Sequence, residues 1–538
     1  MTRTCCVLVL AVTILAIALR LPRLQQRPMH GDEAVHAIKF GKLLEEGVYT
    51  YDPDEYHGPT LNYLTLVPAW LTGAVNLAQV SEFTLRIVPV FFGACLILLL
   101  LLVARPLGTG ATVYAAVLTA VSPAMVFYSR YYIQEILLVC FTFGAIASGF
   151  RYARNRSMGW ALLTGVFLGL MHASKETCVI ALGSMVLALL LTLLMQRRDG
   201  SLLTALRTVP RSHWAGGLVA GLIVSGLFHS SFLTNPGGIL DSIRTYTTYL
   251  GRASGNAMHL HPWSYYLEML IYFRYGDGPI WTEALIVLLA VVGLIAAMTR
   301  KGLSSANAPL VRFIAFYTII MTVVYSAIPY KTPWCLLGFL HGMILLAGVG
   351  AVVLVRLVPN VLPRLIVLFL LFDTSVHLTW EACRASYTFD ADSRNPYVYA
   401  HPTAEVFTIV RRIEQYAGAH KDGRNMPIEV ICPGDDYWPL PWYLRAFKRV
   451  SWLNHVVEDT DSAPLIIASP EVEGALTRKL YTLTPLEKRQ MYLFLFDKPY
   501  YMWLRPEVKL LGFVRRGLWD RLQRQQTDAA QAQTVGEK

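Results

Sequence analysis

Acidic, basic and imidazole side chains recur in short segments between long apolar runs of this sequence. A carboxylate can take a proton from a hydroxyl group, and isolated cations can hold a phosphate that leaves during group transfer. One base and a cationic clamp are enough for such a transfer, because a phosphate leaving group is already acidic and needs no general acid. The candidate residues, in chain order, are Asp32, Glu33, His57, Arg130, Glu135, Lys175, His259, His261 and Lys331.

The composition excludes a soluble protein for most of the chain. Of 538 residues, 54% are hydrophobic and 15% are charged, whereas soluble domains carry roughly 25% charged residues. The net charge of +11 does not indicate nucleic-acid binding, because the basic residues stand singly or in small groups between apolar runs rather than on one polar face. The cysteines form no C-x-x-C pair, so they carry no zinc or redox signature.

The apolar runs predict an integral membrane, all-α domain. A bilayer-spanning helix needs ~20 mostly apolar residues, and about eleven segments meet this criterion. The first is expected to be a retained helix, because Arg20 and Pro22 stand where a signal peptide would have a small-residue cleavage site. The segments centre on residues 5–21, 87–104, 111–127, 133–150, 158–172, 176–195, 214–230, 281–298, 312–328, 334–354 and 362–380.

Loop charges predict the orientation of a multi-pass protein in the inner or plasma membrane. Lys and Arg in short loops stay preferentially on the cytoplasmic side. With a cytoplasmic N-terminus, the inner loops are the more basic ones, although the cations after the first helix oppose this count. The tight outer turns then hold one cation each: Arg130, Lys175 and Lys331.

The long outer loop after the first helix contains two amphipathic segments, Glu33–Glu46 and Thr60–Leu77. Amphipathic helices of this kind lie at the membrane surface. A second long outer loop, Ser231–Ile280, opens on the turn signal Asn235-Pro236-Gly237-Gly238.

A change of composition near residue 382 divides the chain into a membrane domain, 1–381, and a soluble extracytoplasmic domain, 382–538. Val406–Tyr416 has helical periodicity, whereas Ile428–Cys432 and Leu465–Ala468 are short apolar runs. These patterns predict a small α/β domain. Cys383 and Cys432 would both lie in it, and whether they pair is left open because the sequence does not give their separation.

Nearly all candidate polar residues fall on the outer face in this topology. Ionisable groups at membrane depth are costly and mark a functional site by default. Transfer of a sugar from a polyprenyl phosphate needs one base and a cationic clamp at a lipid surface, and this set supplies both.

The ordered motifs resemble the GT-C superfamily of polyprenyl-phosphate-sugar transferases, near the protein O-mannosyltransferases and the lipid A aminoarabinose transferases. Tyr330 to Cys335, Asn395 to Tyr397 and Tyr437 to Tyr443 resemble a narrower prokaryotic branch described as flippase-associated. The motifs that carry the superfamily resemblance are Gly31-Asp32-Glu33-Ala34, Tyr56-His57-Gly58-Pro59-Thr60, Ser129-Arg130 with Glu135, and Ala173-Ser174-Lys175.

The resemblance implies that Asp32 is the catalytic base, that Glu33 shapes its surroundings, and that Lys175 binds the donor phosphate. It places Arg130 and Glu135 near the donor or acceptor pocket.

His57 stands where the aminoarabinose transferases carry a metal-liganding glutamate. The cofactor therefore stays unassigned, with a divalent metal ion held by His57 and Glu135 as one alternative. Lys331, His259 and His261 are further candidates for contacts with a substrate.

Structural alternatives accompany these roles. Acidic residues such as Asp32 and Glu33 stabilise a helix N-terminus. Lys175 at a helix end can extend its ammonium group to the membrane surface. Arg130 and Glu135 can form a structural ion pair. The resulting hypothesis is an inverting glycosyltransferase whose donor is a polyprenyl-phosphate sugar and whose hydroxyl acceptor is a lipid, glycan or protein. The alternatives are a component of a lipid-linked sugar flippase, a transporter without chemistry, and an inactive scaffold.

Overall fold

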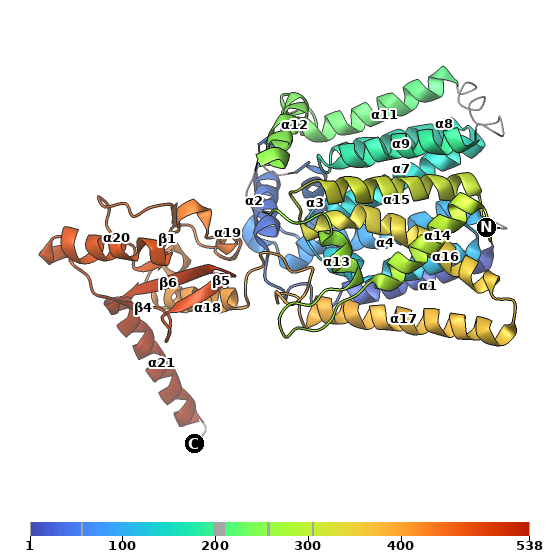
Figure 1. The fold of residues 1–538 in the computed structure, drawn as a ribbon. Coiled ribbons are helices and arrows are strands. Elements are labelled where there is room, and N and C mark those ends of the chain that lie inside the picture. The colour runs from blue at the N-terminus through green and yellow to red at the C-terminus, as the bar shows by residue number, and fades with distance from the viewer. Residues whose placement is uncertain (1, 55–56, 197–209, 256–258, 304–305, 537–538) are drawn as a thin grey trace. The chain divides into compact units, whose positions relative to one another are not determined.

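A computed structural model describes residues 2–54, 57–196, 210–255, 259–303 and 306–536. The chain forms two compact units, which are taken separately below (Figure 1). The first comprises Met1–Gln25, Lys39–Val75 and Val80–Tyr399. The second comprises Gln26–Ile38, Asn76–Gln79 and Ala400–Lys538, so it joins the C-terminal region with two short segments of the N-terminal region.

The first unit is a bundle of long helices, as predicted. In the described part of the chain, seven helices are long and apolar enough to cross a membrane, and α5, α8 and α14 are shorter apolar helices. α11 falls outside both groups. The bundle consists of α1 (Arg3–Arg20), α4 (Glu82–Leu107), α5 (Thr109–Val121), α6 (Pro123–Tyr128), α7 (Glu135–Asn155), α8 (Met158–His172), α9 (Cys178–Gln196), α11 (Arg211–His229), α14 (Ala284–Thr299), α15 (Ala308–Ala327), α16 (Leu337–Leu357) and α17 (Val361–Tyr387).

Each predicted span falls on one of these helices, except that α5 and α6 divide the span 111–127. Pro123 lacks the N–H that a continuous helix needs, and the Ser122 hydroxyl accepts the Met125 N–H to start the new helix. Inside the bundle, α14 and α16 approach so closely that a Cβ on Gly293 or Gly350 would overlap a backbone carbonyl of the other helix. Small residues at such crossings are typical of packed membrane helices.

Shorter helices join the membrane helices: α2 (Gly31–Glu46), α3 (Thr60–Leu71), α12 (Gly238–Gly255) and α13 (Tyr265–Ile271). α3 is shorter than the predicted segment Thr60–Leu77 because Gly73, with φ +72°, follows its C-cap and ends it. The sequence did not predict α12 within the second outer loop.

The second unit contains a six-stranded mixed sheet in the order β2-β1-β3-β6-β4, with β5 paired to β6. β1 pairs in parallel with β2, with Ile428 opposite Val450, and with β3, with Ile428 opposite Leu465. β6 is antiparallel to its neighbours. The strands are β1 (Ile428–Ile431), β2 (Val450–Leu453), β3 (Leu465–Ala468), β4 (Tyr492–Phe494), β5 (Tyr501–Arg505) and β6 (Val508–Arg515).

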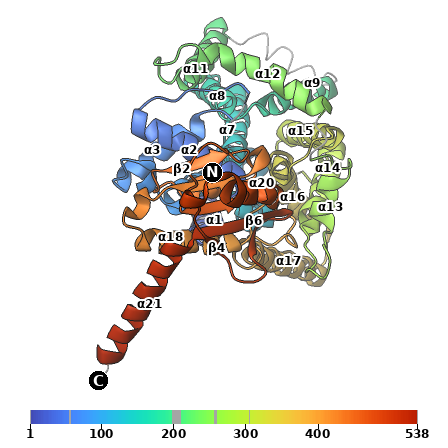
Figure 2. The ribbon, with the colours of Figure 1, turned by 90° about the vertical axis from the view of Figure 1, so that its left-hand side faces the viewer.

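Helices cover both faces of this sheet, which explains why every residue of β1 and β3 is buried. α18 (Glu405–Ala419) packs Ile409 and Ile413 into the core on one face. On the other face, Leu476 of α20 (Glu473–Arg478) packs with Ile466. α21 (Arg516–Gly536) projects away from the sheet (Figure 1 and Figure 2). The predicted α/β domain is therefore present.

The predicted domain boundary at residue 382 lies within α17, which continues to Tyr387. The first compact unit extends further, to Tyr399. Cys383 and Cys432, whose pairing the sequence left open, are both free thiols.

Candidate active site

The turn between α8 and α9 is fixed to the segment that leads into α3. The Thr60 N–H donates to the Ala173 carbonyl at 3.2 Å, and the hydroxyls of Thr60 and Ser174 lie 2.7 Å apart. A Cβ on Gly58 would lie 2.2 Å from the Ala173 oxygen, so only glycine permits this approach. The sequence motifs around His57 and Lys175 are thus brought together.

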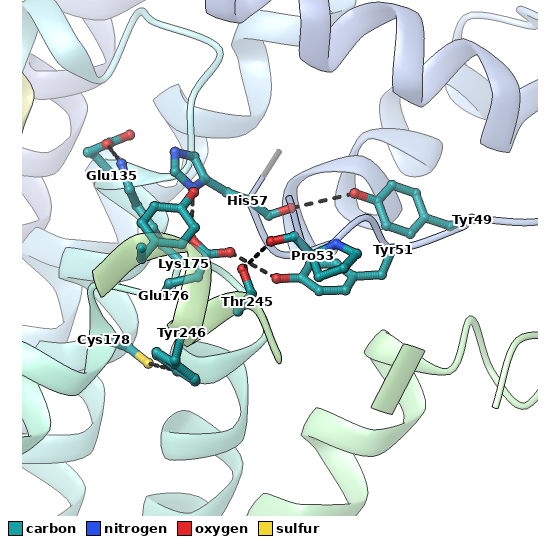
Figure 3. Close-up of polar contacts among 11 residues, drawn as sticks. Tyr49, Tyr51, Pro53, His57, Glu135, Lys175, Glu176, Cys178, Thr245 and Tyr246 are labelled. Atoms are coloured by element: carbon teal, nitrogen blue, oxygen red, sulfur yellow. Dashed lines mark hydrogen bonds and ion pairs between the residues drawn. The ribbon is translucent and has the colours of Figure 1, made fainter. Parts of the chain in front are cut away.

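Lys175 forms an ion pair with Glu135, the first residue of α7 (Figure 3). Both residues are buried. Burial alone would lower the pKa of Lys175, but the adjacent Glu135 carboxylate outweighs it and raises that pKa above its ordinary value. The expectation of a lone cation is therefore corrected: a buried ammonium needs a counter-charge, and Glu135 supplies it.

Glu176, the next residue, forms a second buried pair. Its Oε2 lies 2.8 Å from Nδ1 of His57, and the Tyr51 hydroxyl donates to Oε1 at 3.0 Å (Figure 3). Burial would raise the pKa of Glu176, but His57 more than compensates and holds that pKa below its ordinary value. The site prediction omitted Glu176, although its position beside Lys175 in an outer turn was a signal for it.

α12 packs over this second pair. The Tyr249 hydroxyl lies 3.0 Å from Nδ1 of His57. The Thr245 hydroxyl donates to the Pro53 carbonyl at 2.8 Å (Figure 3). The helix that the sequence missed therefore helps to hold His57 in place.

A small pocket, with room for about one water molecule, adjoins the Lys175–Glu135 pair. Oε2 of Glu135 is buried and, in the described structure, has no hydrogen-bond partner. The pocket thus combines a buried ammonium, an open carboxylate oxygen and mostly apolar walls. Its other lining residues are Leu138, Val139, Thr142, Thr177, Ala181, Tyr317, Met321, Tyr325, Trp334, Cys335, Leu337 and Gly338.

Arg130 lies in a different environment from Glu135. Its Nη1 donates to the carbonyls of Arg20 and Pro22, both at 2.7 Å, and its guanidinium stacks 4.6 Å from the Tyr387 ring. These hydrogen bonds give partners to carbonyl groups at the C-terminal end of α1. A cation at this end also interacts favourably with the helix dipole. Within the described residues, Glu135 pairs with Lys175 and not with Arg130, the partner that the sequence offered as an alternative.

Lys331 lies close to the two histidines of the segment before α13. Leu260 and Tyr330 make an isolated β-bridge, and Nζ of Lys331 donates to the carbonyls of His261 (3.1 Å) and Ile328 (2.5 Å). The His259 imidazole hydrogen-bonds the Tyr399 hydroxyl. His261 stacks on Tyr265 with ring centroids 4.1 Å apart. Lys331 is 1% exposed, and its ammonium is used for backbone contacts.

Asp32 and Glu33 begin α2 and belong to the second unit. Glu33 is fully buried: Oε1 pairs with Arg27 at 2.9 Å, and Oε2 accepts the His30 N–H at 3.1 Å, as in a capping box. The Asp32 side chain is 51% exposed, with Nδ1 of His30 3.9 Å from its Oδ2. Glu33 is therefore held in buried contacts, and Asp32 is the accessible carboxylate of the two.

The fold that holds these residues is similar to the folds of known proteins. Residues 64–225 match the family model described as Dolichyl-phosphate-mannose-protein mannosyltransferase. The structure is similar to that of ArnT from Cupriavidus metallidurans in the apo state, with a TM-score of 0.61 and 15% sequence identity, over 94% of this chain and 97% of that chain. This chain has the GT-C fold.

Two further structures share the GT-C fold with this chain. ArnT from the same organism, bound to undecaprenyl phosphate, gives a TM-score of 0.61 at 14% identity, over 94% of this chain and 97% of that chain. The archaeal oligosaccharyltransferase AglB from Archaeoglobus fulgidus, in complex with an inhibitory peptide and a dolichol-phosphate, gives 0.54 at 12% identity, over 88% of this chain and 70% of that chain. No curated protein matches the sequence significantly.

The sequence also offered a metal site as one alternative for this chain. His57 and Glu176 are a plausible pair of ligands, but among the residues that the structure describes no group of three His, Cys, Asp or Glu side chains converges on one point. Two protein donors are fewer than the three or four typical of a zinc site. Glu135, the other candidate ligand, is instead paired with Lys175.

Proposed function

We propose that this protein is a membrane glycosyltransferase that moves a sugar from a polyprenyl-phosphate donor to a hydroxyl acceptor at the extracytoplasmic face. The observation that carries the proposal is the GT-C fold shared with ArnT over 94% of this chain, since ArnT has been crystallised bound to undecaprenyl phosphate. The buried ammonium of Lys175, which lies beside mostly apolar side chains, suits a ligand of the same class.

Lys175 is the candidate for the donor phosphate. Its raised pKa keeps the ammonium charged, and an ammonium stabilises the negative charge that grows on a departing phosphate. The open Oε2 of Glu135 lies ready to accept a hydroxyl hydrogen from the same ligand. The pair would thus hold one phosphate and one hydroxyl.

Asp32 is the candidate base. Its carboxylate takes the proton of the acceptor hydroxyl while the acceptor oxygen attacks the anomeric carbon and the bond from that carbon to the phosphate oxygen breaks. The products are the glycoside, with inverted configuration, polyprenyl phosphate and protonated Asp32. The half-exposed side chain suits this role, because a base must reach a substrate proton.

A transporter of lipid-linked sugar is the rival proposal. Transporters place substrate sites near the bilayer midplane, commonly at interrupted helices. Here the two buried acid–base pairs lie at the turn between α8 and α9 and the start of α7, which are helix ends. This position favours chemistry at a membrane surface.

The direct test is reconstitution of the full chain in liposomes with a panel of radiolabelled polyprenyl-phosphate sugars and hydroxyl acceptors. We expect one donor to lose its sugar to an acceptor, with polyprenyl phosphate as the second product. Movement of intact donor across the bilayer without any glycoside formed would favour the transporter.

The proposed orientation predicts that the C-terminal domain is outside the cytoplasm. Asp459→Cys, at an exposed position in that domain, should react with a membrane-impermeant maleimide in intact cells. Lys301→Cys, exposed in a predicted inner loop, is the matched control and should react only after lysis. The opposite pattern would invert the topology and remove the proposed extracytoplasmic site.

A further inference from the structure

The segment that carries Asp32 is held by the C-terminal domain. Gln26–Ile38 belongs to the same compact unit as Ala400–Lys538. The Met29 N–H donates to the Tyr443 hydroxyl at 2.8 Å. Trp438 packs beside the helix start, with its Cβ 3.9 Å from the position that a Cβ on Gly31 would occupy.

The same part of the domain holds the second inserted segment, Asn76–Gln79. Nε of Arg445 donates to the Leu77 carbonyl at 3.2 Å, and the Arg445 guanidinium stacks 3.7 Å from the ring of Trp442. Trp442 and Tyr443 are adjacent residues in α19 (Leu440–Tyr443). One short helix therefore contributes to the contacts with both segments.

His30 connects this contact to Asp32. Its Nδ1 accepts the Asp32 N–H at 3.0 Å, so Nδ1 carries the lone pair and the imidazole satisfies an open amide in the first turn of α2. Its ring lies 4.9 Å from the ring of His401, at an interplanar angle of 54°. Both histidines are buried, with 5% and 1% exposure.

We propose that the C-terminal domain is the positioning element of the candidate base. His401 and Tyr443 hold His30 and Met29, and His30 fixes the backbone of Asp32, while the Asp32 carboxylate stays accessible. This inference rests on the proposed function, in which Asp32 takes the acceptor proton. These contacts act on the main chain of Asp32 and not on its carboxylate. The residues that make them, His30, His401 and Tyr443, are therefore positioning residues rather than groups that touch the substrate.

The first test compares His30→Ala with His30→Asn in full-length protein. Alanine removes the acceptor for the Asp32 N–H, whereas asparagine supplies an oxygen that can serve as an N-cap. Because small displacements of a reacting group can cost ~10²-fold in rate, we expect His30→Ala to lower kcat about 10- to 100-fold with the KM for the donor little changed. His30→Asn should restore most of kcat.

The second test removes single contacts from the C-terminal domain. Tyr443→Phe deletes only the hydroxyl that accepts the Met29 N–H, and His401→Ala deletes the ring beside His30. Arg412→Ala is the matched control, because Arg412 of the same domain pairs with the exposed Asp497. The first two variants should lower kcat and the control should not.

Hydrogen exchange of the peptide covering residues 26–38 gives a readout that does not depend on activity. Exchange should rise in Tyr443→Phe, His401→Ala and His30→Ala, and stay at the wild-type rate in Arg412→Ala. Unchanged exchange in the first three would overturn the inference even if the wild type transfers sugar. Faster exchange with unchanged kcat would show that the domain holds the segment without positioning a base. If the wild type transfers no sugar, the proposed function fails, and the positioning role fails with it. Hydrogen exchange of residues 26–38 still reports, in that case, whether the C-terminal domain holds this segment.

Discussion

Asp32→Asn should lower sugar transfer by about 10²–10⁴-fold, the contribution of a general base. Asparagine keeps the shape of the side chain but cannot take the acceptor proton. It also suits the first turn of a helix, so α2 should still form. The measurement is initial-rate transfer in liposomes, together with donor binding, which should be retained.

Glu33→Gln is the comparison that separates chemistry from folding. Glu33 is buried and paired with Arg27, so the glutamine variant should be less stable, while each folded molecule should transfer sugar faster than Asp32→Asn does. Full transfer by Asp32→Asn would leave Asp32 with only the role of an acid at a helix N-terminus.

The membrane helices were predictable because length and apolar composition alone determine them. A run such as 87–104 has few alternatives to a spanning helix, and it falls within α4. α12 was not predictable by the same rule, since it mixes apolar and polar residues after a strong turn signal. Its contacts with His57 and Pro53 arise only in the folded chain.

The partners of the charged residues were harder to predict than their positions. Arg130 and Glu135 are five positions apart and were weighed as an ion pair, but the chain between them is a non-helical turn, and Arg130 reaches the end of α1 instead. Glu135 finds its partner at Lys175, and His57 finds Glu176 much further along the chain. Pairings between residues so distant in sequence leave no local pattern.

The assignment of Asp32 to a structural unit shows the same limit. Chain order placed it in the membrane domain, because it follows the first spanning helix. The structure groups residues 26–38 with the C-terminal domain, through contacts such as that between Met29 and Tyr443. Nothing in either segment alone indicates the other.

Lys175→Met is expected to have a large effect for two separable reasons. It leaves the Glu135 carboxylate buried without its counter-charge, and breaking a buried pair in this way costs about 3–5 kcal/mol of stability. It also removes the ammonium that we propose for the donor phosphate. A loss of activity in this variant alone would therefore not identify the role of Lys175.

The double variant Lys175→Met with Glu135→Met resolves the two roles. It removes both charges together, and replacing a buried ion pair by hydrophobic residues of similar volume is often close to neutral for stability. We expect its melting temperature to return towards the wild-type value. Donor binding should stay weak, by roughly 10- to 100-fold, because a hydrogen bond to a charged group contributes about 1.5–3 kcal/mol.

Binding of a radiolabelled polyprenyl phosphate to protein in detergent, measured beside thermal unfolding, separates the outcomes. Weak binding by a stable double variant supports a phosphate contact at Lys175, because stability and ligand affinity then respond to different changes. Recovery of both stability and binding would make the ion pair purely structural. The donor phosphate would then need another cation, and among the predicted candidates Arg130 and Lys331 already donate to backbone carbonyls.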